Sequence, residues 1–562
     1  MIDKKIKRRK FFAQSGVGAL ALSVAPAAAI TACASTSNHI EEEEDGQVLF
    51  IGEDIAVANT AYGKVKGYIM KGIYTFHGIP YADDASGKNR FMPPQEPKAW
   101  DGIRPAVFYG NSAPQKIYDR SPESYYAFVD QWNYDEVSED CLRLNIWTPG
   151  IADGMKRPVV VWLHGGRFSN GNGIEQDGYH GENFSRYGDV VFCSINHRLG
   201  PIGFSDFSAV GGEAFKDSGN VGLLDIIAAL KWVNKNIANF GGDPNNVTVM
   251  GQSGGGDKVC LVAAMPEAKG LVHKAVALSG FYIKGMNKAY SQDLGRYILQ
   301  EAGITISQIH QLQEMPWQDY IDLALRAEKR MEKEKGSSGM RFGSFGPQAD
   351  GVHIPLGEFY NSTDKVPDIP MLMCTTFHEW TMGRTEPELE DITLEGVIRE
   401  LQATYGNNAE EIVHAYAENF PNSKPIEIWA LIRSNRQRVV SAAKAKLKQK
   451  SPLYVAWFGW SSPLFDYRMR SFHCLDISFW FLNTDLMVTH TGGGARPRKL
   501  SKKMADALLS FMRTGNPNGV SALPHWPAYT TENGETMILN DECNVANDPD
   551  KIGRSVLDKY SV

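Results

Sequence analysis

The chain has 562 residues, of which 43% are hydrophobic and 11% aromatic, so it can bury a large core. Its formal net charge is −7, and because residues 1–32 carry +5, the rest of the chain carries about −12. An acidic chain without a basic stripe excludes nucleic acid as the partner. The 7 cysteines and 13 histidines show no metal-type spacing, so no metal site is expected.

The N-terminus has the composition of an export signal. A basic segment that ends with Arg8 and Arg9 precedes an apolar stretch over residues 17–30, which Cys33 follows. This order predicts that residues 1–32 are a cleaved signal, and the apolar stretch is too short for a membrane span. The paired arginines resemble a twin-arginine signal, and the residues before Cys33 resemble a bacterial lipobox, which would make Cys33 a lipidated N-terminus. The alternative is an ordinary cleaved signal with Cys33 incidental.

The signal predicts an exported protein that is periplasmic or in the cell envelope. Its contact with a membrane would then be limited to the lipid on its N-terminus. Residues 33–46 are small, polar and acidic, with an unbroken acidic run over residues 41–45. Such a run is typical of a solvated segment, so residues 33–46 are predicted to be a flexible tether.

The stretch around Ser253 has the pattern of a nucleophile elbow. A β-branched run over residues 247–249 predicts a buried strand. Gly251, Ser253 and Gly255 then form G-x-S-x-G ahead of a predicted helix, whose free N–H groups favour negative charge. The alternative is a plain glycine-rich turn, since the chain has 54 glycines. An acid, a histidine and an oxyanion hole elsewhere in the chain decide between the two.

Further motifs occur in order along the chain. They are FHGIPYA at 76–82, EDCLRLNIWTP at 139–149, NHRLGPIGF at 196–204, GNVGLLD at 219–225 and FMRTGNP at 511–517. Together they resemble the type-B carboxylesterases, a family of large α/β-hydrolases. The resemblance implies an α/β-hydrolase fold, with a large, mostly parallel sheet flanked by helices and with insertions that form a cap or gorge. We expect one such domain over residues 47–562.

The resemblance also implies a catalytic triad, in the chain order serine, acid, histidine. Residues 369–380 form a predicted strand and turn similar to the family segment that carries the acid, which assigns this role to Glu379. A histidine followed three positions later by an acidic residue and then by an aromatic-rich helix matches the family pattern at His473, the implied base. His490 is the alternative base, and Ser253 is the implied nucleophile. The competing interpretation of Glu379 is a surface glutamate.

The loop after the predicted strand at residues 159–163 is similar to the oxyanion loop of the family. By this resemblance, the backbone N–H groups of Gly166, Arg167 and Gly254 would bind the oxyanion. Most relatives have glycine or alanine in place of Arg167, and glutamate in place of Gln252. Backbone donation survives a change of side chain, so catalysis is still expected. Arg167 is a possible substrate anchor that grips an acidic group, or it points outward or pairs with an internal acid.

These assignments predict a serine carboxylic-ester hydrolase that acts on a small-molecule ester through an acyl-enzyme and needs no cofactor. The same machinery could instead hydrolyse amides, carbamates or polyesters. A rival from another class is a non-catalytic adhesion module, because the family fold includes such proteins. Those proteins typically lack the serine or the histidine, and both are present here.

Other residues are predicted to hold the fold together. The resemblance implies structural ion pairs between Arg90 and Glu139 and between Arg198 and Asp225. The scattered cysteines are expected to be free buried thiols.

Aromatic side chains are dense in two segments, residues 118–134 and 457–481. Such segments either line a gorge for an apolar substrate group or belong to the core. The sequence leaves both interpretations open.

Overall fold

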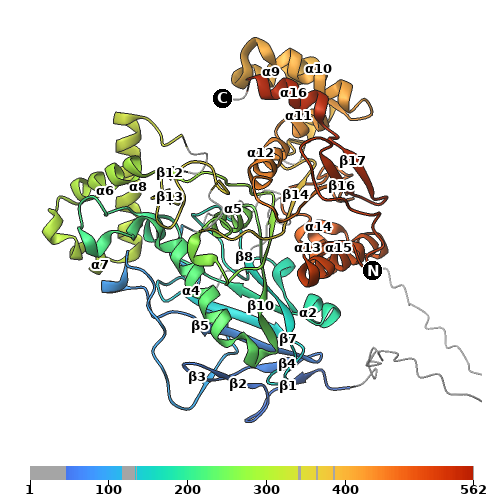
Figure 1. The fold of residues 1–562 in the computed structure, drawn as a ribbon. Coiled ribbons are helices and arrows are strands. Elements are labelled where there is room, and N and C mark those ends of the chain that lie inside the picture. The colour runs from blue at the N-terminus through green and yellow to red at the C-terminus, as the bar shows by residue number, and fades with distance from the viewer. Residues whose placement is uncertain are drawn as a thin grey trace, which may run out of the picture. The chain divides into compact units, whose positions relative to one another are not determined.

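A 12-stranded sheet lies at the centre of the computed structural model, with helices on both of its faces (Figure 1). Residues Val48–Val562 form one unit. The structure describes residues 46–116, 133, 136–339, 343–361, 365–383 and 386–560. The predicted export signal, nearly all of the tether with Cys33, and most of the aromatic segment at 118–134 lie outside the described residues.

The large sheet is parallel in its middle and antiparallel towards its edges. In sheet order, its strands are β1 Leu49–Phe50, β4 Tyr68–Met70, β5 Ile73–Pro80, β7 Arg143–Thr148, β9 Val191–Ile195, β8 Arg157–Leu163, β10 Gly242–Gln252, β11 Lys274–Leu278, β14 Met371–Thr376, β15 Leu453–Phe458, β16 Glu535–Leu539 and β17 Asn544–Asn547. Neighbours from β9 through β16 run parallel. The predicted large, mostly parallel sheet is confirmed.

Two small sheets accompany the large one. The first contains β2 Val57–Thr60, β3 Gly63–Lys66 and β6 Ile103–Pro105, and the second contains β12 Met286–Asn287 and β13 Gln348–Ala349. The α-helices, labelled as in Figure 1, are α2 Glu182–Gly188, α3 Gly200–Phe204, α4 Val221–Asn236, α5 Gly254–Val262, α6 Lys288–Ala302, α7 His310–Glu314, α8 Trp317–Lys335, α9 Leu394–Tyr405, α10 Ala409–Asn419, α11 Pro425–Ile432, α12 Arg436–Lys446, α13 Ile477–Trp480, α14 Val488–Thr491, α15 Ala495–Thr514 and α16 Lys551–Tyr560.

The sheet separates two hydrophobic cores. Successive side chains of a strand point to opposite faces, so Val159 and Val161 of β8 join one core while Val160 and Trp162 join the other. Helices α4, α5 and α12 contribute to the first core, and α2, α13 and α15 to the second. Because helices cover both faces, the middle strands are continuous apolar runs rather than alternating ones.

The parallel pairing brings several loops to one edge of the sheet. Strand β10 pairs with β8 on one side and with β11 on the other, and β11 pairs with β14. The carboxyl ends of these strands therefore share an edge, which is where open α/β sheets bind ligands. The loops that leave β8, β10 and β14 carry Arg167, Ser253 and Glu379, respectively.

Both predicted ion pairs are present, and their side chains are buried. Nε of Arg90 donates to Oε1 of Glu139 at 2.6 Å. Nε of Arg198 donates to Oδ2 of Asp225 at 2.8 Å. Each buried charge is thus paired, as burial in a low-dielectric core requires.

The aromatic segment at 457–481 belongs to the core. Trp457, Trp460 and Trp480 are each fully buried and pack into hydrophobic clusters. None of these three side chains lines the large cavity described below. The core interpretation is therefore right for this segment.

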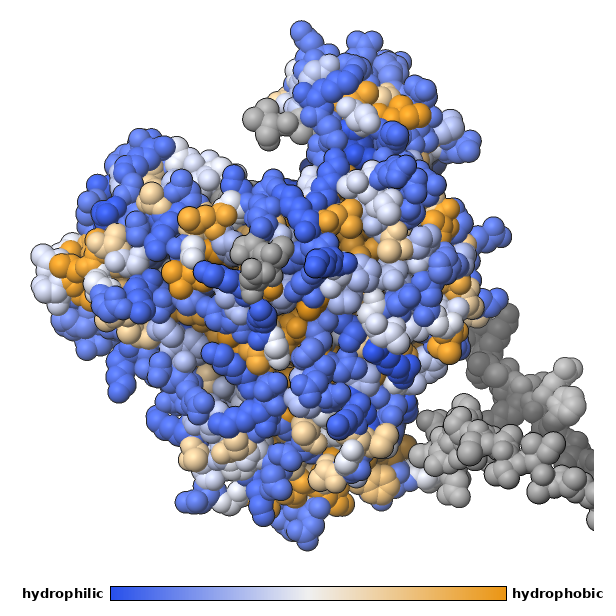
Figure 2. All heavy atoms as spheres, in the orientation of Figure 1, coloured by the Kyte–Doolittle hydropathy of each residue, from blue (hydrophilic) through white to orange (hydrophobic). Residues whose placement is uncertain are grey.

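The described cysteines are free thiols. They are buried at Cys141, Cys193, Cys260 and Cys374 and half-buried at Cys474 and Cys543. On the outside, the face seen in Figure 2 is mostly hydrophilic, with hydrophobic residues in small separate groups. No helix within the described ranges is long and apolar enough to span a bilayer.

Candidate active site

Ser253 lies at a tight turn between β10 and α5. Its backbone has φ 58° and ψ −126°, a strained conformation for a residue with a side chain. A Cβ on Gly251 would lie 2.6 Å from the carbonyl oxygen of Leu163, and one on Gly255 only 2.0 Å from it. The predicted strand, turn and helix are therefore present, and close backbone approach requires both glycines.

Glu379 and His473 meet at the carboxyl edge of the sheet. Glu379 lies in the turn after β14, and His473 lies in the loop ahead of α13. Nδ1 of His473 is hydrogen-bonded to Oε2 of Glu379, and its backbone N–H donates to the Glu379 carbonyl oxygen at 3.3 Å. Oε1 of Glu379 accepts the backbone N–H of Thr376 at 3.0 Å and the hydroxyl of Thr375. The end of β14 thus fixes the carboxylate, and the carboxylate fixes the imidazole.

In this pair, each residue favours the charged form of the other. Burial by itself would raise the pKa of Glu379, but His473 and hydrogen bonds from neighbouring hydroxyl groups lower it below its ordinary value. Burial disfavours the charged form of His473, yet Cys474 and Glu379 raise its pKa well above 6.5. Burial also raises the pKa of the Cys474 thiol, which is therefore neutral. The Glu379 carboxylate is thus the charge that makes His473 a stronger base.

The other histidines near this site lie outside the arrangement. Burial lowers the pKa of His378 to about 4, and its Nδ1 lies 3.0 Å from the hydroxyl of Ser471. His490, the alternative base, is buried against Phe472 with the ring centroids 5.2 Å apart. In the described part of the chain, no group of His, Cys, Asp or Glu side chains could hold a metal ion.

The loop after β8 packs directly on the start of α5. Gly166 and Arg167 have φ values of 74° and 59°. A Cβ on Gly254 would lie 2.3 Å from the backbone nitrogen of Arg167, and one on Gly165 would lie 3.6 Å from Cβ of Ser253. Among the described residues, no backbone carbonyl group of a turn or loop accepts the N–H of Gly166 or Gly254. Gly166 and Arg167 line the same cavity as Ser253, and Gly254 follows the serine and packs on Arg167.

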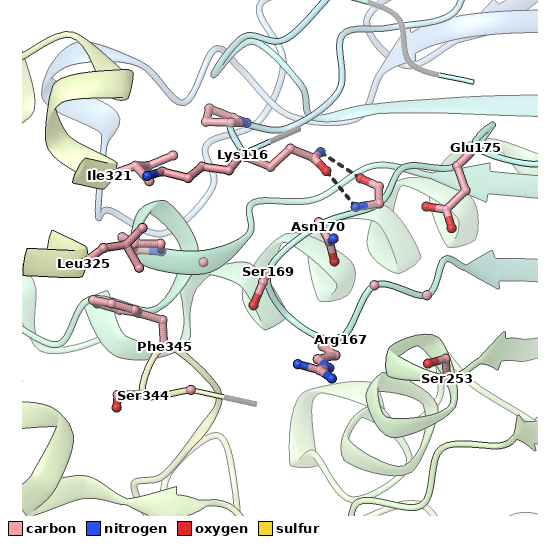
Figure 3. A pocket seen from close by; sticks show the side chains of 18 of the residues that line it. Lys116, Arg167, Ser169, Asn170, Glu175, Ser253, Ile321, Leu325, Ser344 and Phe345 are labelled. Atoms are coloured by element: carbon pink, nitrogen blue, oxygen red, sulfur yellow. Dashed lines mark hydrogen bonds between the residues drawn. The ribbon is translucent and has the colours of Figure 1, made fainter. Parts of the chain in front are cut away.

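Ser253 and His473 line one cavity of about 640 Å³, part of which is drawn in Figure 3. This volume lies in the range of small-molecule sites. Ile321 and Leu325 of α8 and the nearby Phe345 give the cavity an apolar wall. Besides His473 and Cys474, the ionisable side chains in the lining are Lys116, Arg167, Glu175 and Glu328. The cavity thus suits a ligand that is largely apolar and carries a few polar groups.

Several contacts of His473 were not predicted from the sequence. Trp380 stacks on its ring with centroids 4.6 Å apart. The amide nitrogen of Gln252 lies 3.4 Å from each ring nitrogen, and Sγ of Cys474 lies 3.2 Å from the amide oxygen of Gln252. Each of these residues is the chain neighbour of a predicted triad member, which is the one signal in the sequence that pointed to them.

Comparison with known proteins identifies the family. The model of the family described as "Carboxylesterase family" matches residues 54–552 of the chain. The chain belongs to the carboxylesterase family. This carboxylesterase is 34% identical over 504 residues to para-nitrobenzyl esterase of Bacillus subtilis (strain 168), covering 89% of this chain and 98% of that protein. It is 31% identical over 511 residues to phenmedipham hydrolase of Pseudarthrobacter oxydans, covering 86% and 95% of the two chains.

A solved structure of similar fold supports the same conclusion. It is an esterase from the anaerobic Clostridium hathewayi that can hydrolyze aliphatic aromatic polyesters, with a TM-score of 0.79 and 34% sequence identity. The match covers 91% of this carboxylesterase and 99% of that chain. The predicted family, α/β-hydrolase fold and carboxylesterase activity are confirmed.

Proposed function

We propose that this carboxylesterase hydrolyses small-molecule esters through an acyl-enzyme on Ser253, with His473 as base and Glu379 as its orienting acid. The observation that carries the proposal is the hydrogen bond between His473 and Glu379, in a cavity that Ser253 also lines. A strained serine turn, an oriented base and a buried acid are the parts that acyl transfer by serine requires.

The tautomer of His473 assigns the direction of proton transfer. Because the Glu379 carboxylate can only accept, Nδ1 donates to it, and the lone pair that takes a proton lies on Nε2, where the Gln252 amide nitrogen is 3.4 Å away. His473 Nε2 takes the proton of the Ser253 hydroxyl as Oγ attacks the ester carbonyl, and then gives it to the departing alcohol. Water deacylates the enzyme by the same route, and the ionised Glu379 stabilises the imidazolium in each step.

The negative charge that develops on the carbonyl oxygen needs fixed donors. Backbone N–H groups of Gly166, Arg167 and Gly254 fill this role in the proposal, which the packing of Arg167 on Gly254 and the shared cavity with Ser253 support. The N-terminus of α5 adds a favourable dipole. Removing one such donor typically costs about 10²–10³ in turnover.

The acyl-enzyme step is tested by rapid mixing of the purified protein with p-nitrophenyl acetate. A burst of p-nitrophenol equal to the enzyme concentration, followed by slower steady release, is the expected result, because p-nitrophenol leaves easily and the acetyl-enzyme is hydrolysed more slowly than it forms. Linear release from time zero, combined with no trappable acyl adduct, contradicts the covalent route.

The alcohol and acyl preferences depend on the cavity. We propose that Arg167 favours esters that carry a free carboxylate near the scissile bond, such as fragments of polyesters. The Arg167 side chain is exposed and lies on the cavity that contains Ser253 (Figure 3). A residue that holds its ligand tightly would be buried, whereas the Arg167 side chain is in contact with solvent. Solvent screening therefore limits the expected selectivity to about three- to tenfold.

The test compares kcat/KM for a matched pair of esters, one acidic and one neutral. Arg167→Ala is expected to remove the preference for the acidic ester and to leave neutral-ester hydrolysis nearly intact, because the backbone N–H remains. Lys116→Ala is the matched control. Lys116 is a second cation in the lining of the cavity, but its Nζ is paired with Oδ1 of Asp322 at 2.6 Å. An acidic-to-neutral ratio that Arg167→Ala leaves unchanged excludes the anchor.

We also propose that the enzyme is a lipoprotein of the cell envelope, with residues 33–46 as a tether and residues 47–562 as a single catalytic domain. The basic, apolar and small residues that end at Cys33 support this. Cys33→Ser is expected to release the esterase from membranes or to leave it unprocessed, whereas Cys543→Ser keeps it in the membrane fraction. A mature N-terminus other than a lipidated Cys33, found by mass spectrometry, overturns the proposal.

A further inference from the structure

Lys258 is a cation buried beneath the loop that carries the proposed oxyanion hole. It lies on α5, five residues after Ser253, and its side chain is 0% exposed. Nζ donates to the carbonyl oxygen of His164 at 3.0 Å and lies 3.4 Å from that of Gly165. These contacts join the first helix of the elbow to two successive peptide groups of the loop. The sequence motifs give no role to this lysine.

The contact of Lys258 with the Gly165 carbonyl oxygen affects the N–H of Gly166, a proposed oxyanion donor. The carbonyl of Gly165 and the N–H of Gly166 belong to one planar trans peptide group, so they point in opposite directions. Attraction of the carbonyl oxygen towards Lys258 therefore directs the Gly166 N–H away from the buried side. Glycine on both sides of this peptide group gives it freedom to rotate, and a rotated group would present a carbonyl oxygen to the oxyanion. His164 Nδ1 lies 3.0 Å from the same oxygen and shares this restraint.

A positive charge at this place also strengthens the donor. An ammonium beside a carbonyl oxygen polarises the peptide group, and hydrogen bonds in a chain reinforce one another inside a protein. The ring centroid of Phe168 lies 5.9 Å from Nζ, and the full burial of Lys258 keeps water from the contact. The effect is therefore larger than it would be at the surface.

The surroundings of Lys258 contain two acids and two imidazoles. Burial lowers the pKa of Lys258 to about 7, while Glu175 and Asp257 act in the opposite direction. Burial raises the pKa of Glu175 to about 7 and that of Asp257 to about 6. His164 and His197 stack with centroids 4.8 Å apart, and burial lowers the pKa of both, so they stay neutral. Among these ionisable groups, Lys258 is the one whose side chain donates to the carbonyl groups of both His164 and Gly165.

Burying an ammonium costs free energy unless hydrogen bonds repay it, and those of Lys258 go to the loop of the proposed oxyanion hole. We infer that Lys258 is a positioning residue for ester hydrolysis, whose ammonium holds the Gly165–Gly166 peptide group with its N–H towards the substrate oxygen. The inference rests on the proposed oxyanion hole.

The test uses two substitutions and one matched control. Lys258→Met keeps the length of the side chain but removes its charge and its donors, and Lys258→Gln keeps a neutral donor. Lys446→Met is the control, because Lys446 on α12 is also 0% exposed and donates to Oε1 of Gln449 at 2.7 Å. For each variant, kcat and KM for a neutral ester, the unfolding temperature, and the affinity for a trifluoromethyl ketone are measured. This ketone forms an oxyanion with the serine, so its affinity reports the hole directly.

Lys258→Met is expected to lower kcat about tenfold and to weaken ketone binding by a similar factor, with KM changed less than about threefold, because the interaction is realised in the transition state. Lys258→Gln should fall between Lys258→Met and wild type, which also keeps the test open if the methionine variant fails to fold. Lys446→Met should lower the unfolding temperature and leave kcat and ketone affinity alone.

Two results overturn the inference: unchanged kcat and ketone affinity in Lys258→Met and Lys258→Gln, or losses no larger than those of Lys446→Met. The proposed function fails separately, and is recognised by a different readout. If the proposed function is wrong, a fluorophosphonate will not attach to Ser253 in the wild-type protein. If it does attach there while both Lys258 variants behave as wild type, only the role of Lys258 is wrong.

Discussion

Ser253→Ala is expected to lower kcat for a p-nitrophenyl ester by about 10⁴–10⁶, because the hydroxyl that forms the acyl-enzyme in the proposal is removed. His473→Ala should cause a similar loss, since the hydroxyl of Ser253 is a weak nucleophile until a base takes its proton. Residues that act as a unit are not additive. The double variant should therefore lose little more than either single variant. Steady-state kinetics on the three purified proteins measure this directly.

Ser169→Ala is the control for this experiment, because Ser169 is an exposed serine that lines the same cavity. It should retain near wild-type kcat, and all variants should unfold at similar temperatures. Ser253→Ala with more than about a tenth of wild-type kcat would remove the basis for covalent catalysis at this residue.

Glu379→Gln is expected to lower kcat by roughly 10²–10⁴ while leaving the cavity intact. The Glu379 carboxylate accepts from Nδ1 of His473 and is fully buried, so it both selects the tautomer and stabilises the imidazolium. A glutamine can present its amide N–H₂ to Nδ1, which favours the wrong tautomer. Because Glu379 also raises the pKa of His473, the acidic limb of the kcat profile should move to lower pH in the variant.

The direction in which the acidic limb moves follows from the protonation state that His473 needs as a base. Catalysis needs neutral His473, so wild-type kcat falls as pH drops through the raised pKa, and the variant should keep its remaining activity to lower pH. Asp476→Asn is the matched control. Asp476 is buried close to the pair and burial raises its pKa to about 7, but it accepts from Trp480 rather than from His473. Equal kcat in Glu379→Gln and Asp476→Asn would exclude Glu379 as the orienting acid.

Much of the fold near the nucleophile could be predicted from the sequence alone. The β-branched run over residues 247–249 marked a strand because β-branched side chains pack well on the faces of a buried sheet. The start of β10 at Gly242 could not be predicted. Residues 243–246 are polar or proline, and a shift in register between Gly242 and Val247 interrupts the pairing with β8. Local composition describes the apolar centre of a strand better than its irregular end.

The candidate site divides in the same way. Glu379 and His473 came from motif resemblance and chain order, since nothing in their local sequence shows that they touch. The contact of Lys258 with His164 joins residues 94 positions apart and depends on the packing of α5 beneath the loop after β8. The sequence around either residue therefore contains no sign of this contact. The exposure of Arg167 was also beyond the sequence, because it depends on how the cavity opens.

The most direct test of the central claim is to identify the residue that reacts. The purified protein is treated with a fluorophosphonate, digested and analysed by tandem mass spectrometry. One phosphonyl group per chain on Ser253, with labelling lost in Ser253→Ala and slowed in His473→Ala, is the predicted result. A phosphonyl group on another serine, or none on folded protein that hydrolyses esters, would contradict it.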